Sequence, residues 1–243
     1  MEKEKIIAII PARGGSKGIP RKNIKLFCGK PLLAWKVEAA IKSGIFDRII
    51  LSTDDQEIAE VGKKYKAEIL FMRPKELAVD TTPTIAVLQH AITWLLDNEQ
   101  YFPDAVAILE PTTPGVESFH LQEAWEIFKK TKADSVISIL DVPSQFNPFW
   151  QFTISKNNQL SLFSGDHIKK IIRRRQDLPT TYYRNSALYI FNPKLLFDAA
   201  PSFYGEKVYG YIMDKKYSMD LDRPEDWEVA ENEFQNIHSI FNK

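Results

Sequence analysis

Four basic side chains and three glycines are concentrated between Pro11 and Asn23, directly after the apolar run Ile6–Ile10. Glycine lets the backbone approach a ligand and turn N–H groups toward it, while Lys and Arg neutralise phosphate oxygens. The residues concerned are Arg13, Gly14, Gly15, Lys17, Gly18, Arg21 and Lys22. We interpret the segment as a loop that holds a triphosphate; the alternative is a polar turn with solvated charges. Its spacing fits neither the P-loop nor the dinucleotide fingerprint.

A second candidate is the acidic pair Asp220 and Asp222, near the carboxyl end of the chain. We expect a strand from Lys216 to Met219 to end at this pair, and residues i and i+2 of an extended chain point to the same side. Two carboxylates so placed can share one Mg²⁺, with waters and phosphates completing its coordination. The alternative for Asp222 is a cap on the helix that Pro224 begins.

Composition excludes several other classes of function. Lys and Arg total 32 and Asp and Glu total 32, so no net charge attracts nucleic acid or an anionic membrane. The single cysteine, Cys28, excludes an internal disulfide and a cysteine metal site. The apolar run near the N-terminus is too short for a signal segment or a membrane span. We therefore expect a cytoplasmic protein without nucleic-acid or membrane partners. The four histidines show no ligand spacing, and no nucleophilic triad is visible.

The elements that must position these residues alternate between strands and helices. Apolar runs predict strands at 6–10, 48–52, 68–72, 105–109, 135–140 and 187–191, and helical periodicity predicts helices at 31–43, 55–64, 83–97, 118–130 and 224–236. This alternation predicts an α/β fold with a mainly parallel sheet and helices on both faces. We assign residues 1–141 and 184–243 to that core.

Residues 142–183 interrupt the alternation and are predicted to form an insertion. The segment holds three prolines, an aromatic cluster (Phe146, Phe149, Trp150, Phe152) and the basic run Arg173–Arg175. Exposed aromatics would be a liability, so we expect a protein partner to cover them. The alternative is that the cluster folds onto a core of its own.

The motifs together resemble the acylneuraminate cytidylyltransferase family, which activates sialic acid and related nonulosonic acids as CMP-sugars. The resemblance runs nearly end to end and in the family's order. Besides the loop, it rests on these segments: Lys30-Pro31-Leu32, Ser52 to Asp55, Arg73-Pro74, Glu76-Leu77-Ala78, Asp80, Pro111-Thr112, Pro114, Arg175-Gln176, Leu178-Pro179, Asp220-Leu221-Asp222 and Glu225-Asp226. It implies a Rossmann-like three-layer nucleotidyltransferase fold in which the insertion is a dimerisation subdomain contributing to the acceptor site. It also implies Mg²⁺-dependent transfer of CMP from CTP to a nonulosonic acid.

The resemblance also implies roles for single residues. Those expected around the nucleotide are Ala12, Arg13, Gly14, Gly15, Ser16, Lys17, Lys22, Asn23 and Arg73. Those expected around the acceptor are Glu110, Arg175, Gln176, Asn185 and Tyr189. Asp220 and Asp222 match the metal-binding pair, and Lys22, Arg13 and Asp220 are the expected catalytic residues. For Arg73 the alternative is a surface ion pair.

Two departures from the family pattern fall on the acceptor side. Glu110 stands where the family carries an amide, in a segment that here ends Pro114-Gly115-Val116 without the usual arginine, and Ser186 replaces a glycine after Asn185. A carboxylate at 110 would repel an acidic group or favour a cationic one. The alternatives to the first interpretation are therefore a different acidic acceptor, such as a Kdo-like sugar or a phosphonate, and a non-catalytic nucleotide-binding subunit. A nicotinamide dehydrogenase is disfavoured, because this chain lacks the glycine spacing that such an enzyme requires.

Overall fold

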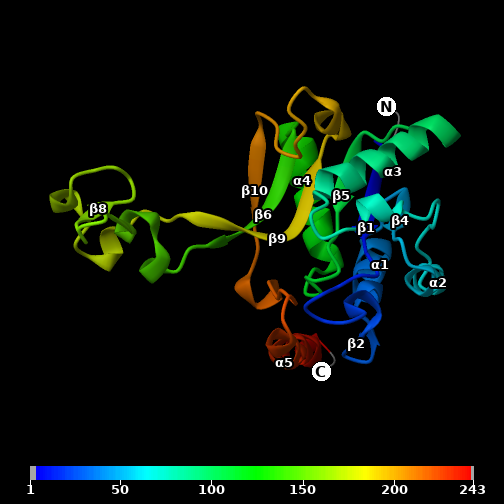
Figure 1. The fold of residues 1–243 in the computed structure, drawn as a ribbon, viewed down its shortest axis with the longest axis horizontal. Coiled ribbons are helices and arrows are strands. Elements are labelled where there is room, and N and C mark those ends of the chain that lie inside the picture. Colours follow the sequence, from blue (N-terminus) through cyan, green and yellow to red (C-terminus); the bar gives the residue numbers. More distant parts are fainter. Residues whose placement is uncertain (1–3, 242–243) are drawn as a thin grey trace. The chain divides into compact units, whose positions relative to one another are not determined.

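The computed structural model describes residues 4–241 and is built on a central six-stranded sheet with the order β10-β6-β9-β5-β1-β4 (Figure 1). Its strands are β1 (Ile6–Pro11), β4 (Arg48–Ser52), β5 (Ala105–Ile108), β6 (Ser135–Asp141), β9 (Tyr182–Phe191) and β10 (Val208–Ile212). β1 pairs in parallel with both β4 and β5, and β9 pairs antiparallel with β5. The short strands β2 (Leu26–Phe27) and β3 (Lys30–Pro31) form a separate antiparallel pair.

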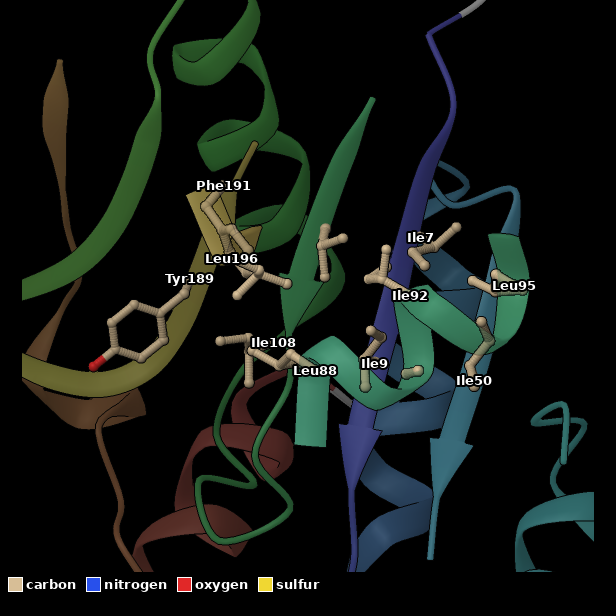
Figure 2. Close-up of a cluster of buried hydrophobic side chains, with 12 residues drawn as sticks. Ile7, Ile9, Ile50, Leu88, Ile92, Leu95, Ile108, Tyr189, Phe191 and Leu196 are labelled. Atoms are coloured by element: carbon tan, nitrogen blue, oxygen red, sulfur yellow. The ribbon is translucent and has the colours of Figure 1, made fainter. Parts of the chain in front are cut away.

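Helices cover the sheet as the periodicity predicts. They are α1 (Leu32–Ser43), α2 (Gln56–Lys64), α3 (Thr84–Glu99), α4 (Ser118–Thr131) and α5 (Pro224–Phe241). In Figure 2, α3 lies in front of the sheet and α1 behind it. Leu88, Ile92 and Leu95 of α3 pack on Ile7 and Ile9 of β1 in one buried cluster. The expected Rossmann-like α/β arrangement is thus confirmed.

Of the six strands expected from apolar runs one is absent, and one strand of the sheet was not predicted. The run 68–72 forms only one isolated bridge, between Ile50 and Glu68, and therefore no strand. Conversely, the sequence patterns missed β10, an edge strand whose residues are mostly exposed and which contains Gly210. Four of its five residues, Val208, Tyr209, Tyr211 and Ile212, favour a strand, but Gly210 interrupts the run.

The chain divides into two compact units, Met1–Ser138 with Asn185–Lys243, and Ile139–Arg184. The expected insertion at 142–183 lies inside the second unit. This unit holds the antiparallel hairpin β7 (Phe152–Ile154) and β8 (Leu160–Leu162). Its backbone is tied by Asn147, whose side-chain nitrogen donates to Pro179 O at 3.0 Å.

The aromatic side chains of the second unit are largely exposed. Phe146 is 63% exposed and Phe163 68%, and Phe149 and Phe152 are also exposed. Within the described unit these rings therefore do not form a core of their own. Across residues 4–241, no helix is both long enough and apolar enough to cross a membrane.

Candidate functional site

The candidate site is built at the carboxyl ends of three parallel strands. β1 leads into the glycine loop, β4 into Ser52-Thr53-Asp54, and β5 into Glu110. Ala12 N donates to Ser52 O at 2.9 Å, which joins the first two of these ends. Ligands of open α/β sheets bind at this edge, and the loop lies where the sequence predicts a ligand.

Polar side chains form hydrogen bonds with the backbone of the glycine loop. Gly14 N donates to Asp54 Oδ1 at 2.9 Å, and Asn23 Nδ2 donates to Arg13 O at 2.9 Å. The N–H of Gly14 is therefore committed to a carboxylate of the protein. The general expectation that the glycine N–H groups turn toward a ligand does not hold at this position.

Arg21, which we expected to contact phosphate, instead contacts two acidic side chains of the protein. Its guanidinium pairs with Asp55 and with Glu57, and its φ of 56° lies in the left-handed region. Asp55 caps α2 by accepting from Ile58 N at 3.0 Å, and the adjacent guanidinium holds the pKa of that carboxyl below its usual range. Arg21 thus anchors the loop to the start of α2.

A cavity of about 280 Å³ brings together the rest of the loop with residues from distant parts of the chain. Its lining is formed by Pro11, Arg13, Ser16, Lys17, Gly18, Lys22, Asn23, Glu110, Pro111, Thr112 and Asp222. Lys22 joins the loop to the acidic pair, since its Nζ donates to Leu221 O at 2.8 Å and lies 3.2 Å from Asp222 Oδ1. The lining therefore combines cations for phosphate with a carboxylate.

The two acidic side chains share one exposed face. Met219 and Leu221 are buried while Asp220 and Asp222 are exposed, which is the alternation of an extended segment. Leu221 N donates to Thr112 O at 2.9 Å and fixes the segment against the cavity. The strand expected from Lys216 to Met219 was wrong, because Lys215–Tyr217 forms a 3-10 turn.

The alternative role for Asp222, as a helix cap, is not what the structure shows. The N–H groups of Asp222 and Arg223 donate to Asp226 Oδ2 at 3.2 and 2.8 Å, so a residue inside α5 closes its own N-terminus. The Asp222 carboxylate pairs with Lys22 instead. It remains available on the cavity side.

The acidic pair suits a hard divalent cation. Partial desolvation and then the neighbouring Asp222 charge raise the pKa of Asp220, so a bound cation would relieve repulsion between the two carboxylates. Within residues 4–241, no group of three or more His, Cys, Asp or Glu side chains is placed to hold a metal. A pair that leaves positions for water and phosphate is the arrangement that Mg²⁺ favours.

A second cavity, of about 240 Å³, shares the lining residues Pro11, Arg13 and Glu110 with the first. Arg73 lines it and is 5% exposed, which contradicts the alternative of a surface ion pair. Its Nε donates to Ser52 Oγ at 3.0 Å and its Nη2 to Ser52 O. Burial lowers the pKa of Arg73 to about 10, with the attraction of Asp54 opposing.

Asp80 also lines the second cavity and pairs with two of the predicted phosphate ligands. Both Arg13 and Lys17 contact its carboxylate, one on each oxygen. These hydrogen bonds lower the pKa of Asp80. In this structure the negative partner of the loop is thus a side chain of the protein itself.

The residues predicted for the acceptor are not all brought to the cavities. Tyr189 is 6% exposed and packs in the core cluster (Figure 2). Its ring also contacts the ring of Phe203. The side chain of Asn185 accepts from Ser138 Oγ at 2.6 Å and donates to Ser218 Oγ at 3.0 Å. Its bonds link the sheet to the segment that precedes Asp220.

Ser186 occupies a left-handed position with φ 58°, a conformation in which glycine is the unstrained residue. Its Oγ accepts a hydrogen bond of 3.3 Å from Tyr189 Oη. The added side chain therefore faces the protein's own tyrosine. Arg175 and Gln176 lie on the 3-10 turn Arg175–Asp177 of the second unit, and their acceptor role stays a prediction.

Sequence reasoning missed Lys36. It is 0% exposed in the middle of α1, and its electrostatic partners are Glu110 and Glu117. Burial raises the pKa of Glu110 to about 7, opposed first by Lys36 and then by Arg73 and Lys22. The signal was present, because Lys36 stands one helical turn from Leu32, Leu33 and Ala40 on the apolar face.

Comparison with known proteins gives a consistent set of relatives. A family model described as Cytidylyltransferase matches residues 7–241. The chain is 36% identical over 226 residues to the pseudaminic acid cytidylyltransferase of Campylobacter jejuni strain 81-176, covering 93% of this chain and 94% of that protein. It is 34% identical over 231 residues to the CMP-N,N'-diacetyllegionaminic acid synthase of Legionella pneumophila, covering 93% and 95%.

A longer relative is the N-acylneuraminate cytidylyltransferase of Escherichia coli O18:K1:H7, which is 34% identical over 254 residues and of which the match covers 57%. Among solved structures, a CMP:2-keto-3-deoxy-manno-octonic acid synthetase complexed with CTP aligns with a TM-score of 0.69 at 12% identity, covering 96% of this chain and 99% of that one. At that identity the likeness supports the fold.

Proposed function

The chain belongs to the cytidylyltransferase family, and on that premise we propose that it transfers CMP from CTP to a nonulosonic acid with release of pyrophosphate. The observation that carries the proposal is the pair of contacts that the Lys22 side chain makes. This side chain connects the cationic loop to Leu221 and Asp222, about two hundred positions away, inside one cavity. Cations for phosphate and one of the two carboxylates proposed for a metal, that of Asp222, thus line the same cavity.

In the proposed reaction a hydroxyl of the acceptor attacks the α-phosphate of CTP, and the bond to pyrophosphate breaks. Catalysis of such a transfer is mainly alignment and neutralisation of charge. Arg13 and Lys17 hold phosphate oxygens after leaving Asp80, and Lys22 offsets the negative charge that develops on the transferring group. The hydrogen bond of 2.8 Å from Lys22 Nζ to Leu221 O supports this placement of the charge.

Cytidylyltransferases generally use a divalent metal ion, and here we propose Mg²⁺ held by Asp220 and Asp222. A bound Mg²⁺ would supply positive charge against the reacting phosphate. Lys22 competes with that ion for Asp222, because it lies 3.2 Å from Oδ1. When a metal binds, we expect Lys22 to turn from Asp222 toward phosphate.

The acceptor class follows the relatives, whose names give pseudaminic, N,N'-diacetyllegionaminic and N-acylneuraminic acids. We further propose a homodimer in which the exposed aromatics of the second unit, Phe146 and Phe163 among them, are covered by a second copy of this chain. Arg175 and Gln176 of that unit would contribute to acceptor binding. We also propose a cytoplasmic location, which the single cysteine supports.

The test is pyrophosphate release from each of the four nucleoside triphosphates, with and without Mg²⁺, using pseudaminic, legionaminic, sialic and Kdo acceptors. Release with CTP and a nonulosonic acid is expected. Release only with Kdo, or only with another nucleotide, would refute the proposed substrates. The same protein in size-exclusion chromatography with light scattering should have twice the mass of one chain, and a monomer would refute the dimer.

Asp220→Asn and Asp222→Asn test the metal assignment, because an amide keeps the shape and removes the charge. Each is expected to lower kcat by about two orders of magnitude or more while the protein stays folded. Asp198→Asn is a matched control, since Asp198 is an exposed aspartate of the same unit outside the cavity lining. Wild-type rates in either test variant would refute the metal role.

A further inference from the structure

Asp226 makes one more hydrogen bond than a helix cap requires. In a capping box the acidic side chain at the third helical position accepts from one backbone N–H, that of the residue preceding the helix. Since α5 begins at Pro224, Asp226 is its third residue and Arg223 precedes it, and Asp226 Oδ2 accepts from Arg223 N at 2.8 Å. The same oxygen also accepts from Asp222 N at 3.2 Å. The additional bond thus holds a residue of the acidic pair.

The backbone of Asp222 is constrained at both ends. Its N–H donates to Asp226, and its carbonyl oxygen lies so close to Gly18 that a Cβ built there would be 2.5 Å away. The carbonyl oxygen of the preceding residue, Leu221, accepts from Lys22 Nζ at 2.8 Å. A constrained backbone leaves the Asp222 carboxylate only its own side-chain rotamers. The direction of this carboxylate is therefore largely set before any ligand binds.

Asp226 is itself held in place by the packing of α5. The next residue, Trp227, is buried, and its ring packs edge-on against Phe27 with 5.6 Å between the ring centroids. Lys25 Nζ lies 4.1 Å from the centroid of the same ring, on which a cation is attracted to the aromatic face. Contacts with the core thus fix Trp227, and the adjacent Asp226 transmits that fixed position to Asp222 through the hydrogen bond.

We propose that Asp226 is a positioning residue that acts through Asp222: it fixes the backbone of the acidic pair so that both carboxylates present to one divalent cation before the cation binds. This inference rests on the proposed function, because it takes Asp220 and Asp222 as the metal ligands. Side chains that orient metal ligands without binding the metal change metal affinity by about 10- to 100-fold when they are replaced. Loss of the Asp226 carboxylate should therefore weaken cation binding by about tenfold or more.

Two simpler roles for Asp226 have to be separated from positioning. A plain helix cap would stabilise α5 without changing cation affinity, and a plain negative charge would attract a cation without fixing any backbone. The side-chain oxygen of Asn can accept from both N–H groups but carries no charge. Asp226→Asn therefore keeps the positioning bonds and loses only the charge, whereas Asp226→Ala loses both.

The experiment compares Asp226→Ala and Asp226→Asn with Glu225→Ala as the control. Glu225 is an exposed acid of the same helical turn, whose carboxylate lies 4.0 Å from Arg223 Nη1, so its removal deletes the same charge. The readout is the Kd of Mn²⁺ alone, from the electron paramagnetic resonance signal of the free ion, with the full chain and no nucleotide. The Kd should rise by about tenfold or more in Asp226→Ala and stay within about threefold of the wild type in the other two variants.

Amide hydrogen exchange of the metal-free protein, followed by NMR, tests the bonds themselves. The amides of Asp222 and Arg223 should exchange slowly in the wild type and in Asp226→Asn, and faster in Asp226→Ala.

The outcomes separate this inference from the proposed function. A lower Tm in Asp226→Ala with wild-type Mn²⁺ affinity would reduce Asp226 to a helix cap, and the metal assignment would stand. Equal losses of affinity in Asp226→Asn, Asp226→Ala and Glu225→Ala would show that charge alone acts, which also overturns positioning. A wild-type protein that binds no Mn²⁺ would refute the proposed metal site, and the role of Asp226 with it.

Discussion

Gly18→Ala should push the glycine loop away from the acidic pair. A Cβ built on Gly18 lies 2.5 Å from the backbone oxygen of Asp222, and since a tolerable contact needs about 3.0 Å or more, the two backbones must separate by about 0.5 Å. That movement stretches the contacts of Lys22 Nζ with Leu221 O and Asp222 Oδ1, which are 2.8 and 3.2 Å. Misplacement of catalytic groups by about 1 Å costs on the order of a hundredfold in rate.

We therefore expect kcat/KM for CTP to fall by about 10- to 100-fold in this variant. Overpacking against backbone should also cost about 1–3 kcal/mol, which for a chain of this size lowers Tm by about 3–10 °C. Pyrophosphate release measures the first effect and differential scanning calorimetry the second.

Gly15→Ala is the matched control, because a Cβ on Gly15 of the same loop meets no atom within 4 Å. Its Tm should stay within about 2 °C of the wild type, and any effect on CTP affinity would report the approach of the nucleotide rather than a clash within the protein. If Gly18→Ala and Gly15→Ala have the same Tm and the same turnover, the reasoning from the Gly18–Asp222 contact is refuted.

Two further predictions concern the other cavity and the scaffold. Asp80→Asn removes the negative charge that Arg13 and Lys17 now contact, so CTP should bind several-fold more tightly by calorimetry at low salt; weaker binding would mean that Asp80 itself helps to hold the nucleotide. Gly115→Ala places a Cβ 2.2 Å from Tyr217 O and should destabilise the protein by at least about 1–3 kcal/mol in urea unfolding, while a wild-type midpoint would show that this close approach is not rigid.

Local patterns predicted most of the fold. All five expected helices are present, because their apolar residues recur at helical spacing. The failures have local causes as well. The run 68–72 has strand-like residues but pairs with β4 at a single bridge, and in β10 Gly210 interrupts the β-branched and aromatic residues. In both cases the pairing partner decides whether the segment forms a strand, and the segment's own sequence does not specify that partner.

For the candidate site, the sequence identified the groups that could do chemistry but not their partners. It predicted a cationic loop and an acidic pair, and residues of the loop line one cavity together with Asp222 of the pair. It could not predict that Arg21 would pair with Asp55, or that Asp80 would contact Arg13 and Lys17, since both pairings join separate loops. Ion pairs of this kind depend on which strand ends are neighbours.

The sequence by itself determined the inventory and order of the functional groups: glycines and lysines directly after the first strand, and two aspartates spaced to share one face. The tertiary structure alone decided that Lys22 reaches Leu221 and Asp222, and that Lys36 of α1 is fully buried. The physical reason is that spacing of one or two residues is set by the local backbone geometry. A contact between residues far apart in the chain exists only after strand order and helix packing have brought them together.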